Sequence, residues 1–299
     1  MKKDHYKSGF VSIIGVPNVG KSTLLNQIVG QKIAIISDKP QTTRNKILAI
    51  HTTDTEQIIF TDTPGIHKPH NRLGEYMVRV AKESMTDTDV LLLVVDATKK
   101  IQEAEREIAE NLQALGIPCI LVINKVDAVR KETLLPLIAD YSSLYPFEEI
   151  VPISAKTGDG TELLLEKIKG YLEEGPQFYY EDMVTDQPEK QIAAEIIREK
   201  LLWLLDKEVP HGIAIEVSKM QELPKITNIY VTIYCEKASH KGIIIGKGGE
   251  MLKKIGSLAR GDIEKMLDKK VYLELWVRVK PDWRNNNYLM KNFGFGENE

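Results

Sequence analysis

The sequence predicts an α/β protein in two parts, a doubly wound parallel sheet followed by a smaller α+β domain. Three observations support this fold class. Short apolar, β-branched runs alternate with helical patterns over the first half of the chain, a stretch rich in prolines and acids interrupts the alternation, and a different order of elements follows. The length of 299 residues also favours two domains over one.

Five apolar runs predict buried parallel strands, because a strand covered on both faces is apolar nearly throughout. A ligand of such a sheet sits at the carboxyl ends of the strands, so residues that follow strands are the candidate site. The runs are residues 10–16, 57–63, 90–97, 118–124 and 148–154; residues 47–53 suit an antiparallel edge strand, and residues 103–115 and 132–144 are helical patterns.

The first candidate is GVPNVGKS, residues 15–22, which follows the first strand and opens an apolar helix. It fits G-x-x-x-x-G-K-[ST], a loop whose backbone N–H groups and helix N-terminus hold phosphates. Lys21 would reach the β- and γ-phosphates, and the Ser22 hydroxyl would bind Mg²⁺. The sequence therefore predicts a nucleoside triphosphate site. The residues expected to line it here are Gly15, Val16, Pro17, Asn18, Val19, Gly20, Lys21, Ser22 and Thr23.

The base is predicted from NKVD, residues 124–127, at the end of another strand. A carboxylate accepts hydrogen bonds, which suits the two donors of guanine and not the acceptor at adenine N1, so Asp127 predicts GTP and GDP. Asn124 is expected to brace neighbouring loops, and Lys125 to lay its aliphatic stem along the base. In the motif Ser154, Ala155 and Lys156, the Ala155 N–H would bond guanine O6.

Two further segments are predicted to respond to the γ-phosphate. In DTPG, Asp62 would hold Mg²⁺ through water and the Gly65 N–H would sense the γ-phosphate, with Thr63 and Pro64 between them. In KPQTTRN, residues 39–45, a threonine hydroxyl would complete the Mg²⁺ shell only with triphosphate bound. Both threonines remain candidates, and Thr43 is preferred to Thr42. Such switch segments are ordered by the γ-phosphate and released by hydrolysis.

The predicted domain boundaries follow from the break in the pattern. Residues 1–174 form the first domain, residues 175–189 a linker with prolines and acids, and residues 190–299 the second domain with a C-terminal tail. The second domain reads helix, strand, strand, helix, helix, strand. Its first helix, within residues 192–208, has apolar positions at helical spacing, which favours a core-facing helix over a membrane-surface one.

A second glycine-rich turn lies in IIIGKGGEML, between an apolar stretch and a helix. A G-x-x-G turn lets a nucleic-acid backbone approach closely, and the helix N-terminus adds positive potential. From Lys237 to Lys291 there are 13 Lys and Arg against 6 Asp and Glu, which predicts single-stranded RNA as partner. A helix-capping turn without a ligand is the alternative. The residues expected to bind RNA are Ile245, Gly246, Lys247, Gly248 and Gly249.

Composition sets the remaining expectations. Cys119 and Cys235 lie in apolar runs without metal spacing, which predicts buried, reduced thiols of a cytosolic protein. The N-terminus has no apolar core of a signal peptide, and no run approaches the roughly 18 apolar residues of a spanning helix, so neither secretion nor a membrane span is expected. His67 and His70 have no common metal spacing and are expected to be solvated loop residues.

The motifs GVPNVGKS, QTTRN, DTPG, NKVD and SAK, in this order over residues 15–156, resemble the translation-factor-related GTPases. With a second part that looks like a type II KH domain, the whole chain resembles the Era family of bacterial ribosome-assembly GTPases. The resemblance implies a P-loop GTPase domain plus a KH domain that binds the 3′ end of 16S rRNA and assists 16S rRNA processing and assembly of the small (30S) ribosomal subunit. It also implies a cytoplasmic location, with any association with the inner face of the cell membrane peripheral. The alternative is a constitutive KH RNA-binding adaptor in which GTP is mainly structural.

The chain departs from Ras-like GTPases at the position that orients the attacking water. Those enzymes have a glutamine after the glycine of the second switch, whereas this chain has Ile66, which cannot hydrogen-bond to water. Asn18 matches an asparagine that helps bind K⁺ in related GTPases, and a plain turn asparagine is the alternative. The candidate catalytic residues are thus Lys21 and Thr43, from the chemistry of their motifs with Mg²⁺ as cofactor, and Asn18, for which the resemblance implies K⁺ as a candidate second cation.

Overall fold

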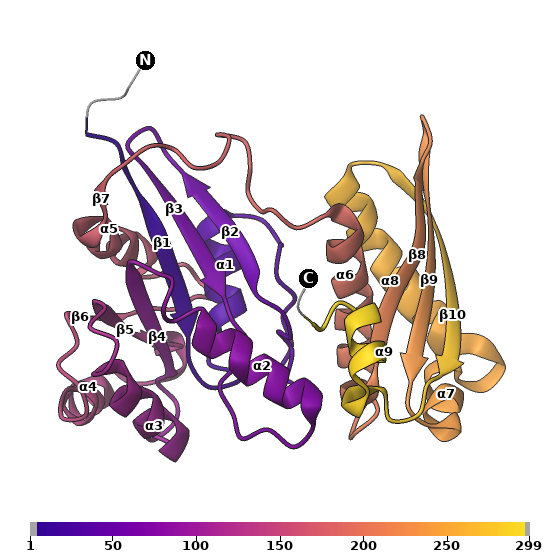
Figure 1. Ribbon diagram of the computed structural model, residues 1–299, viewed down its shortest axis with the longest axis horizontal. Coiled ribbons are helices and arrows are strands. Elements are labelled where there is room, and N and C mark those ends of the chain that lie inside the picture. Colours follow the sequence, from indigo (N-terminus) through magenta and orange to yellow (C-terminus); the bar gives the residue numbers. More distant parts are fainter. Residues whose placement is uncertain (1–4, 297–299) are drawn as a thin grey trace. The chain divides into compact units, whose positions relative to one another are not determined.

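The computed structural model describes residues 5–296 of the chain, so residues 1–4 and 297–299, the outer ends of the two predicted domains, lie outside the description. The chain forms two compact units, each with its own buried core (Figure 1). The first runs through Ala34 and includes Thr43–Lys68 and Met77–Asp186. The second contains Ile35–Thr42, Pro69–Tyr76 and the chain from Gln187 onward.

The first unit is the predicted doubly wound sheet. Its strands lie in the order β2-β3-β1-β4-β5-β6, with β2 antiparallel to β3 at one edge and the others parallel (Figure 1). Each apolar run predicted as a strand forms one, with ends shifted by up to three residues. The strands are β1 Lys7–Ile14, β2 Ile47–Thr52, β3 Glu56–Asp62, β4 Val90–Asp96, β5 Cys119–Asn124 and β6 Glu149–Pro152; the helices are α1 Lys21–Val29, α3 Glu103–Leu112, α4 Leu134–Ser142 and α5 Thr161–Tyr171. Helix α2, Arg72–Glu83, belongs to this unit from Met77 onward.

The register of the parallel strands brings the polar strand ends to one edge of the sheet. Ile13 near the end of β1 lies opposite Asp62, the last residue of β3. Asp96, the last residue of β4, lies opposite Asn124, the last residue of β5. Loops that leave these four strands therefore start side by side, which is the arrangement that a ligand site at a strand-end edge requires.

Helices α2 and α5 do not appear among the elements expected from the sequence. Helix α2 buries Leu73, Met77 and Ala81 at four-residue spacing. Tyr76 and Val80 extend this apolar face, so the segment has a clear helical period that the expectations from the sequence did not include. Helix α5 begins after Gly160, whose φ of 76° is left-handed. Its inward residues Leu164 and Ile168 are fully buried in the first core.

The stretch predicted as a linker, 175–189, begins along the first unit. It follows a two-residue strand, β7 Glu173–Glu174, antiparallel to β1. The N–H groups of Phe178 and Tyr179 donate to Gln57 Oε1 at 2.8 and 3.0 Å. Further along, the Ile50 N–H donates to the Val184 carbonyl at 2.9 Å. The chain leaves the first unit at Asp186.

The second unit has the predicted element order. Its three-stranded sheet has the order β10-β9-β8, with β8 antiparallel and β10 parallel to β9. Helices α6 and α8 lie along this sheet (Figure 1), and their apolar residues form the second core with it. A short tail follows, in which Trp283 is fully buried. The elements are α6 Glu189–Leu204, β8 Ala214–Glu222, β9 Ile226–Cys235, α7 Ala238–Ile245, α8 Glu250–Leu267, β10 Lys270–Val279 and α9 Asn287–Asn292.

The expectations from composition that concern burial hold. Cys119 and Cys235 are free thiols and both are buried, and burial raises the pKa of Cys119 to about 12. Within residues 5–296, no helix combines the length and the apolar character needed to cross a membrane. The same described residues contain no group of three His, Cys, Asp or Glu side chains that could hold a metal ion.

Candidate functional site

The loop between β1 and α1 is pressed against the ends of neighbouring strands. Gly15 and Gly20 have left-handed φ angles of 146° and 101°. A Cβ on Gly15 would lie 2.4 Å from the Val94 carbonyl oxygen, and one on Gly20 would lie 2.3 Å from Asn124 Nδ2. Only glycine fits at either position, because other residues would meet both backbone strain and a fixed neighbour.

Lys21 opens helix α1 and folds back over this loop. Its Nζ donates to the carbonyl oxygens of Gly15 and Val16, both at 3.1 Å. The side chain is buried, and burial lowers the pKa of Lys21 to about 8 against the opposing charge of Asp62. A desolvated ammonium held at the loop is a point charge already placed for a phosphate.

Three oxygen donors from three separate segments meet beside Lys21. Ser22 Oγ donates to Asp62 Oδ2 at 2.6 Å, Thr43 Oγ1 donates to the same oxygen at 3.3 Å, and the two hydroxyls lie 2.9 Å apart. The Thr42 hydroxyl donates instead to the Lys39 carbonyl at 2.6 Å. The three residues predicted as Mg²⁺ ligands are thus the ones that the fold brings together.

The buried carboxylate of Asp62 is only partly satisfied by hydrogen bonds. It is completely buried, and burial raises its pKa, although the Lys21 charge and the two hydroxyls pull it down. Its second oxygen, Oδ1, has no hydrogen-bond partner among the described residues. Buried acceptors are normally satisfied, and hard oxygen donors suit Mg²⁺, so the residues present fit that ion.

The loop after β5 is built around the Asn124 side chain. Its Nδ2 donates to the Val19 carbonyl at 2.8 Å, and its Oδ1 accepts from the N–H groups of Lys125 and Ala155 at 2.8 and 2.9 Å. Asn124 therefore braces the phosphate loop and the SAK motif, which is the role expected for it. The Ala155 N–H would have to share its bond with Asn124 in order to reach a base.

Asp127 is exposed next to this brace. Its Oδ1 accepts from Ser154 Oγ at 2.8 Å, which orients the carboxylate. Its other oxygen is left to accept from a ligand. Lys156, the last residue of the motif, is exposed beside it.

Asp96 is a residue of this site that the motifs did not indicate. Lys125 Nζ donates to Asp96 Oδ2 at 2.6 Å and to the Asn18 carbonyl at 2.8 Å. Burial would raise the pKa of Asp96, but hydrogen bonds from Lys125 and Thr98 outweigh it and hold that pKa below its usual range. The lysine thus ties two strand-end loops to the phosphate loop. An acid at the end of the all-apolar run 90–95 was the available signal.

The DTPG segment packs tightly on the phosphate loop. Thr63 Oγ1 donates to the Ile13 carbonyl at 2.9 Å. A Cβ on Gly65 would lie 2.7 Å from the Pro17 nitrogen. The Ile66 N–H donates to the Gly15 carbonyl at 3.2 Å, and the Ile66 side chain packs against the first core. Pro64, between Thr63 and Gly65, is buried.

The second glycine-rich turn, in the other unit, is open. Gly246, Gly248 and Gly249 have positive φ angles of 74°, 59° and 83°, and α8 begins directly afterwards. No heavy atom lies within 4 Å of a Cβ placed on Gly248 or Gly249. Lys247, between Gly246 and Gly248, is exposed, and Ile245 packs against the second core. The backbone here can be reached by a large ligand.

A groove of about 430 Å³ between α8 and β10 continues from this turn. It combines leucine side chains with cations, and its cationic residues were not singled out from the sequence. Positions 249, 253, 256 and 260 fall on one face of α8, so helical spacing from the turn was the signal that could have found them. The lining residues are Gly249, Leu252, Lys253, Gly256, Ser257, Arg260, Leu273 and Leu275.

Comparison with known proteins places this geometry in a family. Residues 10–125 match the family described as 50S ribosome-binding GTPase, and residues 208–284 match the KH domain. GTPase Era of Ruminiclostridium cellulolyticum is 56% identical over 295 residues, 98% of this chain and 99% of that protein. The chain belongs to the Era family of GTPases. GTPase Era of Alkaliphilus metalliredigens is 54% identical over 97% of this chain and 99% of its own length.

Two solved Era structures share the whole fold. One is Era in complex with MgGDPNP and nucleotides 1506–1542 of 16S ribosomal RNA, with a TM-score of 0.95 and 43% identity over 98% of this chain and all of that one. The other is a single-substitution variant of Aquifex aeolicus Era bound to GDP·AlF4⁻, with a TM-score of 0.94 and 43% identity over 97% of this chain and all of that one. The P-loop GTPase and KH folds expected from the sequence are confirmed.

Proposed function

We propose that this Era-family GTPase is a switch that hydrolyses GTP, binds the 3′ end of 16S rRNA through its second unit, and assists 16S rRNA processing and assembly of the small ribosomal subunit. The observation that carries the proposal is the meeting of Ser22, Thr43 and Asp62 beside a buried Lys21. A related structure holds MgGDPNP and 16S nucleotides together, which supports both ligands for this chain.

In the proposed site, each residue has a separate task. Ser22, Thr43 and Asp62 would hold Mg²⁺, which supplies positive charge at the phosphate oxygens. Lys21 holds a second positive charge at the loop. Asn124 keeps the base loop in register with the phosphate loop, and Asp127 accepts from the two donors of guanine.

Water activation needs a group other than Ile66, because that side chain packs into the core. We propose that Asn18 contributes to a K⁺ site beside the phosphates. Its left-handed φ of 66° and the Lys125 bond to its carbonyl fix this residue in the loop. The proposal predicts faster hydrolysis in K⁺ than in Na⁺ at equal ionic strength, and loss of that difference in Asn18→Ala. Equal rates in the two salts for the parent protein would exclude it.

The RNA would run over the open turn and along the adjacent groove. Its backbone would pass Gly246–Gly249 at the N-terminus of α8, where Gly248 and Gly249 leave room and Lys247 supplies charge. The leucines of the groove would contact bases, while Lys253 and Arg260 face phosphates. The cytoplasmic location and peripheral membrane contact that the resemblance implies stay predictions.

The threonine pair gives the sharpest test of the nucleotide site. Thr43→Ala should lower Mg²⁺-dependent GTP turnover by about tenfold or more, because it removes one oxygen of the cluster. Thr42→Ala is the matched control, since its hydroxyl donates to Lys39 and should change turnover little. Turnover measured across a Mg²⁺ titration separates the two. A larger loss in Thr42→Ala than in Thr43→Ala would contradict the assignment.

The adaptor alternative is separated from the switch by RNA affinity. Binding of single-stranded RNA with the ribosomal 3′ sequence should be measured with a GTP analogue, with GDP and without nucleotide. A switch requires affinities that differ between the first two states, because a ligand shifts a protein only through differential binding. Equal affinities in all three states would favour the adaptor.

A further inference from the structure

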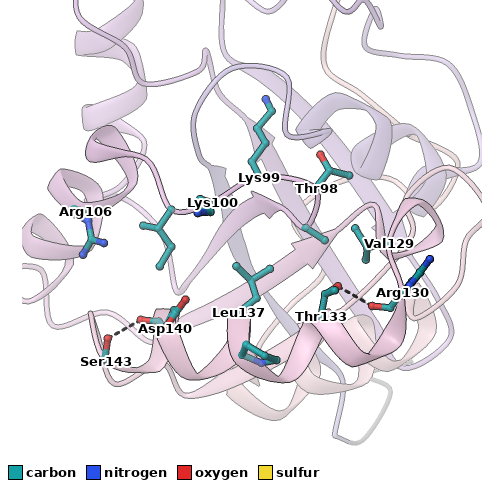
Figure 2. Close-up of a pocket in the computed structure, with 13 residues that line it drawn as sticks. Thr98, Lys99, Lys100, Arg106, Val129, Arg130, Thr133, Leu137, Asp140 and Ser143 are labelled. Carbon is teal, nitrogen blue, oxygen red and sulfur yellow. Dashed lines mark hydrogen bonds between the residues drawn. The ribbon is translucent and has the colours of Figure 1, made fainter.

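A cavity of about 800 Å³ in the first unit lies beside the site described above, since Thr98 lines it and donates to Asp96, but it contains none of the residues assigned to the nucleotide or to Mg²⁺. It lies between the loop after β4 and helix α4, in a volume range typical of ligand sites. Figure 2 shows Arg106 and Arg130 at opposite ends of this pocket with Leu137 between them. Its apolar lining consists of Ala97, Ile101, Val129, Pro136 and Leu137.

The charges around the cavity are unbalanced. Lys99, Lys100, Arg106 and Arg130 line it against a single acid, Asp140. Lys99 Nζ lies 3.7 Å from Oδ2 of Asp96, a residue that does not line the cavity. Within residues 5–296, the side chains of Lys100, Arg106 and Arg130 make no ion pair or hydrogen bond. Exposed arginines without a protein partner, set around an apolar floor, are suited to planar recognition of phosphate.

We propose that this pocket binds a nucleotide unit of RNA. The proposal rests on the proposed RNA-binding function, and it adds a contact on the first unit. The chemistry is that of a nucleoside phosphate, in which the ring lies on Leu137 and Val129 and a ribose hydroxyl donates to Asp140. The cations lie at both ends of the pocket. This favours a nucleotide within an RNA chain, which has a phosphate on each side, over a free nucleotide, whose phosphates all lie at one end.

The test compares two single charge reversals in the full-length protein. Arg106→Glu alters the pocket, and Lys82→Glu, at an exposed lysine of α2, is the control with the same change in net charge. RNA carrying 16S nucleotides 1506–1542 is titrated with a GTP analogue bound, over a salt series. Arg106→Glu should weaken binding about tenfold and reduce the salt slope by about 0.7, the value for one lost single-strand phosphate contact. Lys82→Glu should match the parent.

A second arm separates the two sources of the same chemistry. AMP is titrated into the GDP-saturated protein, because the loop with Asp127 is expected to reject adenine. AMP binding that Arg106→Glu abolishes, together with unchanged RNA affinity, would assign the pocket to a free nucleotide and overturn the RNA proposal. Arg106→Glu that behaves as Lys82→Glu in both arms would remove the pocket as a site altogether.

The outcome is distinguishable from failure of the proposed function. GTP turnover of Arg106→Glu without RNA should equal that of the parent, which shows that the variant is folded. A parent protein that binds no RNA would overturn the proposed function itself. RNA binding that depends on Lys247 and Gly248 but not on Arg106 would overturn only this inference.

Discussion

The two glycine-rich turns of the molecule use the same local chemistry in opposite surroundings. Both place left-handed glycines and a lysine at the start of a helix, α1 in one case and α8 in the other. At the first turn Lys21 is buried, and added side-chain atoms at Gly15 or Gly20 would collide with strand-end residues. At the second turn Lys247 is exposed, and the space beside Gly248 is empty.

The surroundings of each turn determine which phosphate-bearing ligand it can take. The enclosed turn can take only a small ligand, and it fixes charge, metal donors and base-reading residues around it. The open turn offers backbone and one mobile charge to a chain that can extend beyond it. A G-x-x-G or G-K-S pattern therefore indicates phosphate, whereas the neighbouring strands decide which molecule carries it.

Loss of the buried lysine should have the largest effect. Lys21→Ala removes the charge held at the phosphate loop, so turnover should fall by about a hundredfold or more. Its RNA affinity should equal that of the parent without nucleotide, because the second turn is untouched. A GTP turnover assay checks the first expectation, and an RNA titration without nucleotide checks the second. Full turnover in Lys21→Ala would contradict the assignment of the enclosed turn as the phosphate site.

Matched glycine substitutions should separate strain from collision. Gly20→Ala meets both a left-handed φ and Asn124 Nδ2 at 2.3 Å, whereas Gly248→Ala meets the φ strain alone. We expect a loss of about 3 kcal/mol in the free energy of unfolding for the first and about 1 kcal/mol for the second.

Denaturant unfolding can assign each loss to its unit. All three tryptophans, Trp203, Trp276 and Trp283, lie in the second unit. Their fluorescence follows that unit, while circular dichroism follows both. Equal losses for Gly20→Ala and Gly248→Ala would show that the first turn is not held as tightly as its contacts indicate.

A further prediction concerns pH dependence. Because burial lowers the pKa of Lys21 to about 8, GTP affinity should fall as pH rises through that value, by up to about tenfold per unit. The unfolded chain keeps this proton up to the ordinary lysine pKa of 10.5, so without nucleotide the free energy of unfolding should rise with pH across the same window. Lys21→Arg stays charged and should flatten the affinity profile. A GTP affinity of the parent protein that stays constant between pH 8 and pH 10.5 would contradict the lowered pKa of Lys21.

Much of the fold could be predicted because short sequence patterns indicate the individual strands and helices of each unit. The run 90–95 is apolar at every position, and such runs form strands buried on both faces. Helix α2 also has apolar residues at helical spacing, but they are mixed with charged residues and form no continuous run. The identities of Ser22, Thr43 and Asp62 as a group followed from their motifs and strand ends.

The partners inside the site could not be predicted in the same way. The aliphatic stem of Lys125 was expected along the base, and this stays a prediction. The partner of its ammonium was not foreseen. That partner is Asp96, which the strand register places beside Asn124. Arg260 lies on one face of α8 with the turn, but only the packing of β10 makes that face a groove. A motif gives residue types at a spacing, whereas these contacts depend on which elements become neighbours.

We propose the open turn as an RNA site separate from the nucleotide site, and replacing Lys247 and Gly248 by aspartates is the decisive experiment. The space beside Gly248 accepts a Cβ, and aspartate tolerates a left-handed φ, so the variant should fold. Affinity for single-stranded RNA with the ribosomal 3′ sequence should fall by about 3 kcal/mol or more, while GTP turnover without RNA stays at the parent rate. Parental RNA affinity across a salt series, in a variant folded by circular dichroism, would contradict the account.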